Sequence, residues 1–220
     1  MLHKLSLTGL NLLDLGLIDY QEALAKQKEI VSGVINGLYP DTLIFCQHYD
    51  IITIGRRGSI SNVIAGREEL LKKNIKVVFS DRGGDVTYHG KGQLIAYPIF
   101  DLRKSIRDVH LFLRRLECAV INLLKRYGIS GSLKSGKTGV WVDDEKISSI
   151  GIAFSHWVSY HGLSLNVDPD LSRFLLINPC GLKGGKTTSL SQLLGGFIDM
   201  SDVKIKLKDE FIKLFYKDCG

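Results

Sequence analysis

The sequence contains few cysteines and prolines and no long apolar run. Four cysteines in 220 residues, widely spaced and without a CxxC pair, do not support a disulfide scaffold or a cysteine metal site. No apolar run approaches the ~18 residues that span a bilayer. The leucine-rich start, LSLTGLNLLDLGLI, is broken by Asn11 and Asp14 and has no small-residue cleavage site. We therefore expect a protein of the reducing cytoplasm, with no membrane span and no metal.

The composition predicts one folded domain over residues 1–220. Hydrophobic residues make up 45% and charged residues 24%, which excludes disorder, collagen and coiled coil. With only four prolines and no repeat or low-complexity linker, nothing divides the chain. The net charge is +6, which fits either a solvated surface or a docking face for an acidic partner. No helix carries a dense basic stripe and no nucleic-acid motif is present, so we expect no nucleic acid partner.

Hydrophobic periodicity predicts an α+β domain with a mixed, mostly antiparallel sheet flanked by helices. Two neighbouring runs, 42–46 and 51–54, are expected to pair with each other. Asp143, Asp144 and Glu145 predict a hairpin turn. The expected helices are 19–36, 106–127 and 202–216, and the expected strands are 3–7, 42–46, 51–54, 76–80, 93–98, 139–142, 146–154 and 157–167.

Glycines gather in the segment DRGGDVTYHGKGQLIAYP. Glycines let backbone N–H groups approach a ligand closely, and Arg82 and His89 add a fixed cation and a titratable ring. The segment is neither a Walker A loop nor GxGxxG. We interpret it as a binding loop, with an ordinary tight turn as the alternative. Tyr160-His161-Gly162 is a second such place, although His161 also fits a hydrogen-bonded structural role.

Cys180 is the candidate nucleophile. Pro and Gly flank it in NPCG, which predicts a bend where a thiol meets a substrate, whereas Cys46 and Cys118 fall in apolar runs and are expected to be buried. Cys219 is expected to be exposed. Only the thiolate attacks, so an activator is needed, and His89, His161 and Lys146 are candidates. Lys146 also fits a solvated hairpin tip.

Seven ordered segments give a more specific indication. They are LGLIDYQEALAKQ, ITIGRRGSISNV, RGGDVTYHGKGQLIAYP, TGVWVDDEKISSIGI, WVSYHGLSLNV, INPCGL and TTSL. Together they resemble the octanoyl-[acyl-carrier-protein]:protein N-octanoyltransferases of the lipoate pathway. The resemblance implies the fold of the lipoate and biotin protein ligases, with a sheet that forms the wall of an acyl tunnel.

The resemblance also implies roles for individual residues. Cys180 aligns with the acyl-thioester nucleophile and Lys146 with the lysine that lowers the pKa of that thiol. Lys91 replaces a common Pro and Ser164 a common Ala. The implied substrate-binding residues are Arg82, Gly83, Gly84, Asp85, Val86, Thr87, Tyr88, His89, Ser149, Ile150, Gly151, Gly162, Leu163 and Ser164. We expect Leu94–Ala96 and Ile150–Phe154 to line the tunnel, and the N–H groups of Cys180–Gly181 or Gly83–Gly84 to stabilise an oxyanion.

The implied reaction moves an octanoyl group from acyl carrier protein to a lysine of lipoyl domains. The acceptors would be lipoyl domains of 2-oxoacid dehydrogenase complexes and the glycine cleavage H protein. No cofactor is expected, because octanoyl-phosphopantetheine arrives on the carrier, and the enzyme is expected to be a monomer. Lys146 would act either as a cation or as a base. The alternatives are an ATP-dependent lipoate or biotin protein ligase of the same fold and a non-catalytic acyl-binding module.

Overall fold

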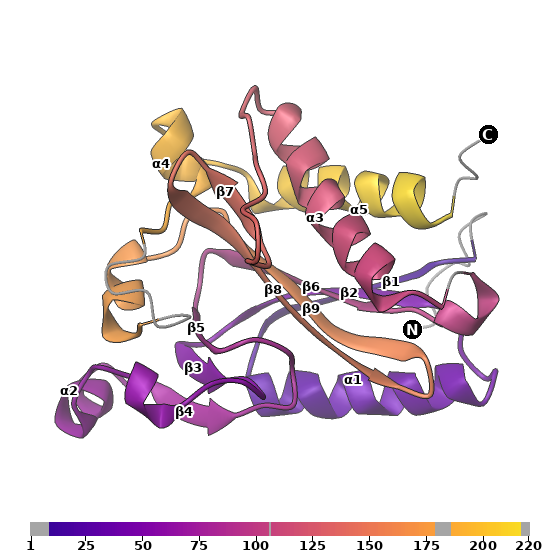
Figure 1. Ribbon diagram of the computed structural model, residues 1–220, viewed down its shortest axis with the longest axis horizontal. Helices are drawn as coiled ribbons and strands as arrows, with labels where there is room; N and C mark the ends of the chain where they lie inside the picture. The colour runs from indigo at the N-terminus through magenta and orange to yellow at the C-terminus, as the bar shows by residue number, and fades with distance from the viewer. Residues whose placement is uncertain (1–8, 106, 179–185, 217–220) are drawn as a thin grey trace.

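The computed structural model describes residues 9–105, 107–178 and 186–216. The strand expected at 3–7, Cys180 and Cys219 lie outside these ranges. Groups of one to three strands are separated by helices along the chain, which ends with two consecutive helices in the described ranges (Figure 1). The strands are β1 (Asn11–Ile18), β2 (Thr42–His48), β3 (Ile51–Ile54), β4 (Lys76–Phe79), β5 (Val86–His89), β6 (Gln93–Ile99), β7 (Val140–Val142), β8 (Glu145–Ser155) and β9 (Val158–Asn166). The helices are α1 (Tyr20–Ile35), α2 (Arg67–Lys72), α3 (Val109–Lys125), α4 (Leu190–Leu194) and α5 (Met200–Phe215).

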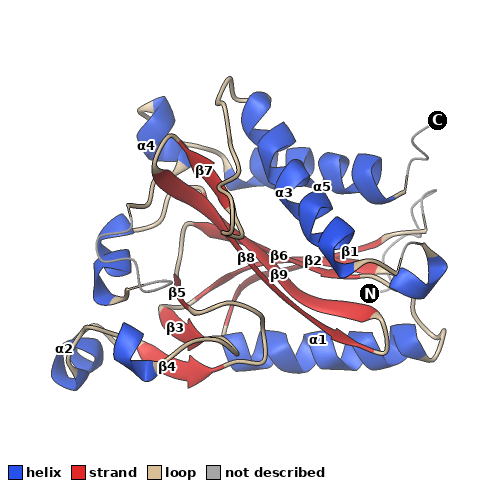
Figure 2. Cartoon of the chain, viewed as in Figure 1, coloured by secondary structure: helices blue, strands red, loops and turns tan. Residues whose placement is uncertain are grey.

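The main sheet has six strands in the order β1-β2-β6-β9-β8-β7, and only the β1–β2 pair is parallel. Helix α1 covers one face, while α3 and α5 pack together on the other (Figure 2). The expected hairpin turn joins β7 to β8. The predicted fold class, an α+β domain with a mixed, mostly antiparallel sheet, is thus confirmed.

A second, three-stranded sheet has the order β4-β3-β5. The prediction that the runs at 42–46 and 51–54 pair with each other was wrong, because β2 lies between β1 and β6 and β3 lies between β4 and β5. All four residues of β3 and nearly all of β2 are buried. Without an alternation of buried and exposed residues, the sequence marks these segments as strands but does not specify their partners.

Side-chain caps set the helix starts. Asp19 accepts a hydrogen bond from the backbone N–H of Gln21 at 2.8 Å and so begins α1. Asp108 accepts from His110 and Leu111 at the start of α3, which therefore begins three residues after the predicted position. Gly128, with φ +73°, follows the end of α3.

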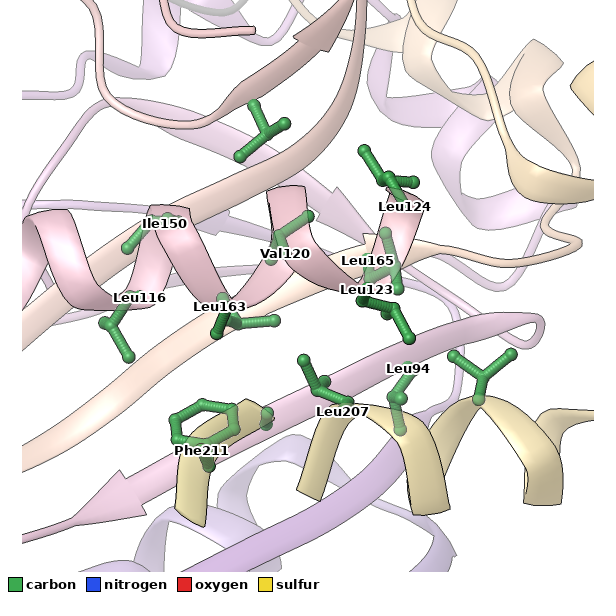
Figure 3. Packing of buried hydrophobic residues seen from close by; sticks show 14 of the residues in the cluster. Leu94, Leu116, Val120, Leu123, Leu124, Ile150, Leu163, Leu165, Leu207 and Phe211 are labelled. Atoms are coloured by element: carbon green, nitrogen blue, oxygen red, sulfur yellow. The ribbon is translucent and has the colours of Figure 1, made fainter. Parts of the chain in front are cut away.

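The largest core lies between the main sheet, α3 and α5 (Figure 3). Helix α3 carries its apolar residues at helical spacing, so one face is buried against the strands. Its Cys118 lies on the opposite side and is exposed, so the prediction of a buried thiol was wrong there, whereas Cys46 on β2 is buried as expected. The core residues labelled in Figure 3 are Leu94, Leu116, Val120, Leu123, Leu124, Ile150, Leu163, Leu165, Leu207 and Phe211.

Candidate active site

A cavity of about 560 Å³ lies where the strands of both sheets meet. It is lined from the second sheet by β5 and the segment before it, and from the main sheet by β6, β8 and β9. Tyr88 is a predicted site residue that does not line it, because its ring turns to the far side of β5 and packs edge-on against Phe174. The predicted site residues that do line it are Arg82, Gly83, Gly84, Asp85, Val86, Thr87, His89, Lys146, Ser149, Ile150, Gly151, Gly162, Leu163 and Ser164.

Two opposed glycines allow backbone to approach backbone beside this cavity. Gly151 on β8 and Gly162 on β9 are directly paired in the sheet. A Cβ added to Gly151 would lie 2.5 Å from the carbonyl oxygen of Gly83, and one on Gly162 would lie 2.1 Å from that of Ala96. Gly83 also donates its N–H to the carbonyl of Ile152 at 2.9 Å. This bond ties the glycine-rich segment to β8 and occupies one N–H expected to serve an oxyanion.

Arg82 acts as the internal clamp of the glycine-rich segment. Its side chain is buried, and its Nε and Nη2 donate to the hydroxyl and carbonyl of Thr53 at 3.0 and 2.7 Å. Nη1 and Nη2 also donate to the carbonyls of Gly83 and Asp85 at 3.0 and 2.7 Å. The guanidinium therefore joins β3 to the segment before β5, so Arg82 shapes the wall of the cavity through its protein contacts.

His161 is held in an unusual backbone conformation at the cavity wall. Its φ is +57°, which is rare for a residue with a side chain, and the buried amide oxygen of Gln27 on α1 accepts its backbone N–H at 2.8 Å. Its Nε2 lies 2.7 Å from Asp81, which also accepts the Tyr160 hydroxyl at 2.6 Å. Burial lowers the pKa of His161 although Asp81 opposes this effect. The imidazole is thus oriented by a carboxylate and tends to be neutral.

A second buried imidazole, His89, lines the same cavity. Its Nδ1 lies 3.1 Å from the Gln93 side-chain oxygen, and its ring packs 6.0 Å from that of His48. Burial, with the neighbouring His48 and Arg82, lowers its pKa well below the ordinary value. Burial lowers the pKa of His48 as well, and its Nε2 lies 2.8 Å from the Tyr97 hydroxyl. His89 therefore presents a hydrogen-bonded ring with a lowered pKa to the cavity, and His48 packs against it outside the lining.

Lys146 lies at the start of β8, half-buried, and lines the cavity, so the alternative of a solvated hairpin tip was wrong. Its Nζ lies 5.1 Å from the centre of the Trp141 ring, an arrangement that stabilises an ammonium. A Cβ on Gly139 would lie 2.6 Å from Lys146 Cε. The backbone of Lys146 pairs with the segment that follows Cys180, accepting from Thr188 at 3.1 Å and donating to Lys186 at 2.9 Å.

Several residues of the cavity wall were not expected from the sequence. Gly136, Lys137 and Thr138, in the loop 133–139 before β7, line the cavity, as do Leu113 on α3 and Arg57. The glycines of GKTG were the available signal for that loop. Of the apolar runs expected to line a tunnel, Ile95, Ile150, Gly151 and Ile152 do so, whereas Leu94 and Ala96 point into the core with α3 and α5 because side chains alternate along β6.

The described residues contain neither a membrane-spanning helix nor a cluster suited to a metal ion. No helix in that part of the chain is long and apolar enough to cross a membrane. No group of three or more His, Cys, Asp or Glu side chains in the same ranges is arranged to hold a metal ion.

The architecture and the glycine-lined cavity define a protein of the lipoate and biotin protein ligase fold. The crystal structure of a lipoate-protein ligase A bound with ATP superposes with a TM-score of 0.78 at 17% identity, over 93% of this chain and 84% of that one. A biotin protein ligase from Aquifex aeolicus gives a TM-score of 0.53 at 17% identity, over 93% of this chain and 68% of that one.

Sequence similarity assigns the chain to one family within this fold. Residues 19–212 match the Lipoyl protein ligase A/B catalytic domain, and the chain belongs to that family, among its octanoyltransferases. An octanoyltransferase of Caldicellulosiruptor bescii is 45% identical over 96% of this chain and 93% of its own length. One of Geobacter metallireducens is 41% identical over 90% of each chain. The protein is therefore an enzyme of the acyltransferase class.

Proposed function

We propose that the protein transfers an octanoyl group from acyl carrier protein to a lysine of a lipoyl domain, through a thioester on Cys180. The observation that carries this proposal is the placement of Lys146. Its side chain lines the cavity, and its backbone pairs with Lys186 and Thr188, which follow the NPCG segment by a few residues. The chain distance from Cys180 to Lys186 is six residues, a span of at most ~20 Å.

In the first step, the Cys180 thiolate attacks the octanoyl carbonyl carbon. The new carbon–sulfur bond forms as the bond to the phosphopantetheine sulfur breaks, and that sulfur leaves as a thiolate and takes up a proton. Lys146 favours the attacking thiolate as an ammonium, in agreement with its position over the Trp141 ring. The Gly84 N–H has no acceptor among the described residues and is our candidate oxyanion donor.

In the second step, the neutral amine of the acceptor lysine attacks the thioester. An amide bond forms, the bond to Cys180 Sγ breaks, and the amine loses one proton to the departing thiolate. The amide is more stable than the thioester, so this step runs downhill. The first step consumes the Cys180 thiolate, and the second returns Cys180 as a thiol, which must give up its proton before the next cycle. We expect Lys146 to lie beside this sulfur, so the Cys180–Lys146 pair is expected to titrate as one coupled unit.

The apolar part of the cavity suits the acyl chain. Leu113, Ile95, Ile150, Ile152 and Leu163 contribute to its lining, and its volume lies in the range of small-molecule sites. At ~0.8 kcal/mol for each buried methylene, an octanoyl chain contributes roughly 5 kcal/mol. This is enough to hold the chain while the two protein partners exchange.

Two cations at the cavity suit acidic, phosphate-bearing partners. Arg57 and Lys137 both line the cavity, are exposed, and form no ion pair among the described residues. Lys134 and Lys186 lie close enough to Asp144, together with Lys137, to lower its pKa. A positive field of this kind speeds the encounter with an acidic carrier and with an acidic lipoyl domain.

Intact mass spectrometry tests the proposal directly. Purified enzyme is incubated with octanoyl-acyl carrier protein, without ATP, and we expect one octanoyl adduct on the wild type and none on Cys180→Ser. Adding a lipoyl domain should remove the adduct and acylate the domain. Equal labelling of wild type and Cys180→Ser would exclude the thioester, a strict requirement for ATP and free acid would indicate a ligase, and octanoyl binding without transfer would indicate a binding module.

Lys146 is tested in the same assay with a charge-preserving variant. We expect Lys146→Ala to reduce adduct formation by at least a hundredfold, and Lys146→Arg to recover part of it because a cation remains beside the sulfur. Equal loss in both variants would instead favour Lys146 as the base.

A further inference from the structure

Glu117 is a fully buried carboxylate on an otherwise apolar helix face. It lies on α3 with a relative exposure of 0%, between the core residues Leu116 and Val120. Taking a carboxylate out of water is costly unless its oxygens are hydrogen-bonded. Leu113, one helical turn earlier, lines the cavity, so Glu117 lies on the same side of α3.

The two oxygens of Glu117 have different partners. Oε2 accepts from Arg114, whose side chain is 58% exposed and reaches in from the surface. Oε1 accepts the backbone N–H of Gly139 at 3.1 Å, across 22 residues of chain. Through this bond α3 holds the end of the loop 133–139, the loop that supplies Gly136, Lys137 and Thr138 to the cavity.

Gly139 is the residue against which Lys146 lies. It has φ +135°, and a Cβ built on it would lie 2.6 Å from Cε and 3.2 Å from Nζ of Lys146. Only glycine combines this backbone conformation with that space. Gly139 N and Lys146 Nζ are thus neighbours, and together with standard bond lengths these contacts place Glu117 Oε1 within about 9 Å of Nζ.

We infer that Glu117 is a positioning residue for Lys146: by holding the Gly139 N–H, it fixes the backbone wall against which the lysine side chain lies. Its ion pair with Arg114 supports the carboxylate from outside but does not touch the cavity. This role rests on the proposed function of Lys146. It predicts that transfer depends on the position of one oxygen atom more than on the charge that it carries.

Three variants of Glu117 separate the effect of the position of its oxygen atom from the effect of its charge. Glu117→Gln keeps an oxygen at the same reach, Glu117→Asp keeps the charge but withdraws it by about 1.5 Å, and Glu117→Leu removes the acceptor. We expect kcat for octanoyl transfer to stay within threefold of wild type in Glu117→Gln and to fall at least tenfold in the other two. The KM for octanoyl-acyl carrier protein should change less than twofold, because the acyl wall is intact.

Glu210 provides the matched control. It is a buried glutamate on α5, 3% exposed, that pairs with Lys213 at 2.7 Å and makes no contact with the cavity. Glu210→Asp should therefore transfer at the wild-type rate. Amide hydrogen exchange at Gly139 gives a readout that does not depend on activity: the N–H should be protected in wild type and Glu117→Gln and should exchange faster in Glu117→Asp.

The outcomes distinguish this inference from the proposed function. Wild-type kcat in a folded Glu117→Asp variant, or a loss in Glu117→Gln as large as in Glu117→Leu, would overturn the role of Glu117 and leave the proposed function standing. Protection of the Gly139 N–H that is unchanged in Glu117→Asp would also overturn it, even if Glu117→Leu fails to fold. Wild-type enzyme that transfers no octanoyl group would instead refute the proposed function.

Discussion

Replacing Arg82 by methionine tests whether this residue is a clamp of the fold. Methionine keeps much of the apolar stem but removes the four hydrogen bonds that the guanidinium donates to Thr53, Gly83 and Asp85. A bond of this kind contributes about 1 kcal/mol, and the carbonyls left behind lose their partner. Because removing a buried charge also recovers some desolvation energy, we expect a net loss of about 3–5 kcal/mol.

Urea unfolding followed by circular dichroism measures this loss. For a chain of this size, each kcal/mol lowers Tm by roughly 2–4 °C, so Arg82→Met should melt about 6–20 °C below wild type. Arg57→Met is the control, because Arg57 is exposed and forms no ion pair among the described residues, and it should change stability by less than about 0.5 kcal/mol. A loss below 1 kcal/mol in Arg82→Met would refute the clamp and return Arg82 to a binding role.

Gly151→Ala would place a Cβ 2.5 Å from the Gly83 carbonyl, so we expect at least a tenfold loss of octanoyl transfer, whereas Gly196→Ala, with open space around it, should transfer normally. Burial lowers the pKa of His48, His89 and His161, so below pH 6.5 the unfolded chain binds more protons at these residues than the native state does. Unfolding free energy should then fall by up to about 4 kcal/mol per pH unit, and equal urea midpoints at pH 7 and pH 5.5 would contradict this. Iodoacetamide followed by peptide mass analysis should label Cys118 and spare Cys46, whose thiol pKa burial raises, and labelling of both at equal rates would argue against the described packing.

Local sequence pattern predicts most of the helices and strands but does not predict which strands pair with each other. The helix expected at 19–36 is α1, and the strands expected at 139–142, 146–154 and 157–167 are β7, β8 and β9. These segments carry their own caps, turns and periodicity. The sequence does not predict β1, because Asn11 and Asp14 interrupt its apolar residues, and it does not predict β5, because glycines lie on both sides of that short strand. Both strands are specified by partners that lie elsewhere in the chain.

The candidate site also contains some residues that the sequence predicts and others that only the fold reveals. Glycine positions indicate Gly83 and Gly162, because close backbone approach requires glycine, whereas Gly151 is implied only by the family resemblance. The sequence does not show that the Arg82 side chain turns inward, because an arginine that binds a ligand and one that holds two segments together are the same residue type. Glu117 was missed altogether, because its partner Gly139 lies 22 residues away and only the fold brings the two together.

The contact at Gly162 limits which sequences this fold can adopt. The obstacle to a side chain there is the main chain of β6, at the Ala96 carbonyl, in the interior of the sheet. A clash between two side chains can be relieved by a second, compensating substitution, but no residue type alters the position of a backbone oxygen. A side chain at Gly162 therefore requires the main chain of β6 to move, and its partner Gly151, which faces the Gly83 carbonyl, is restricted in the same way.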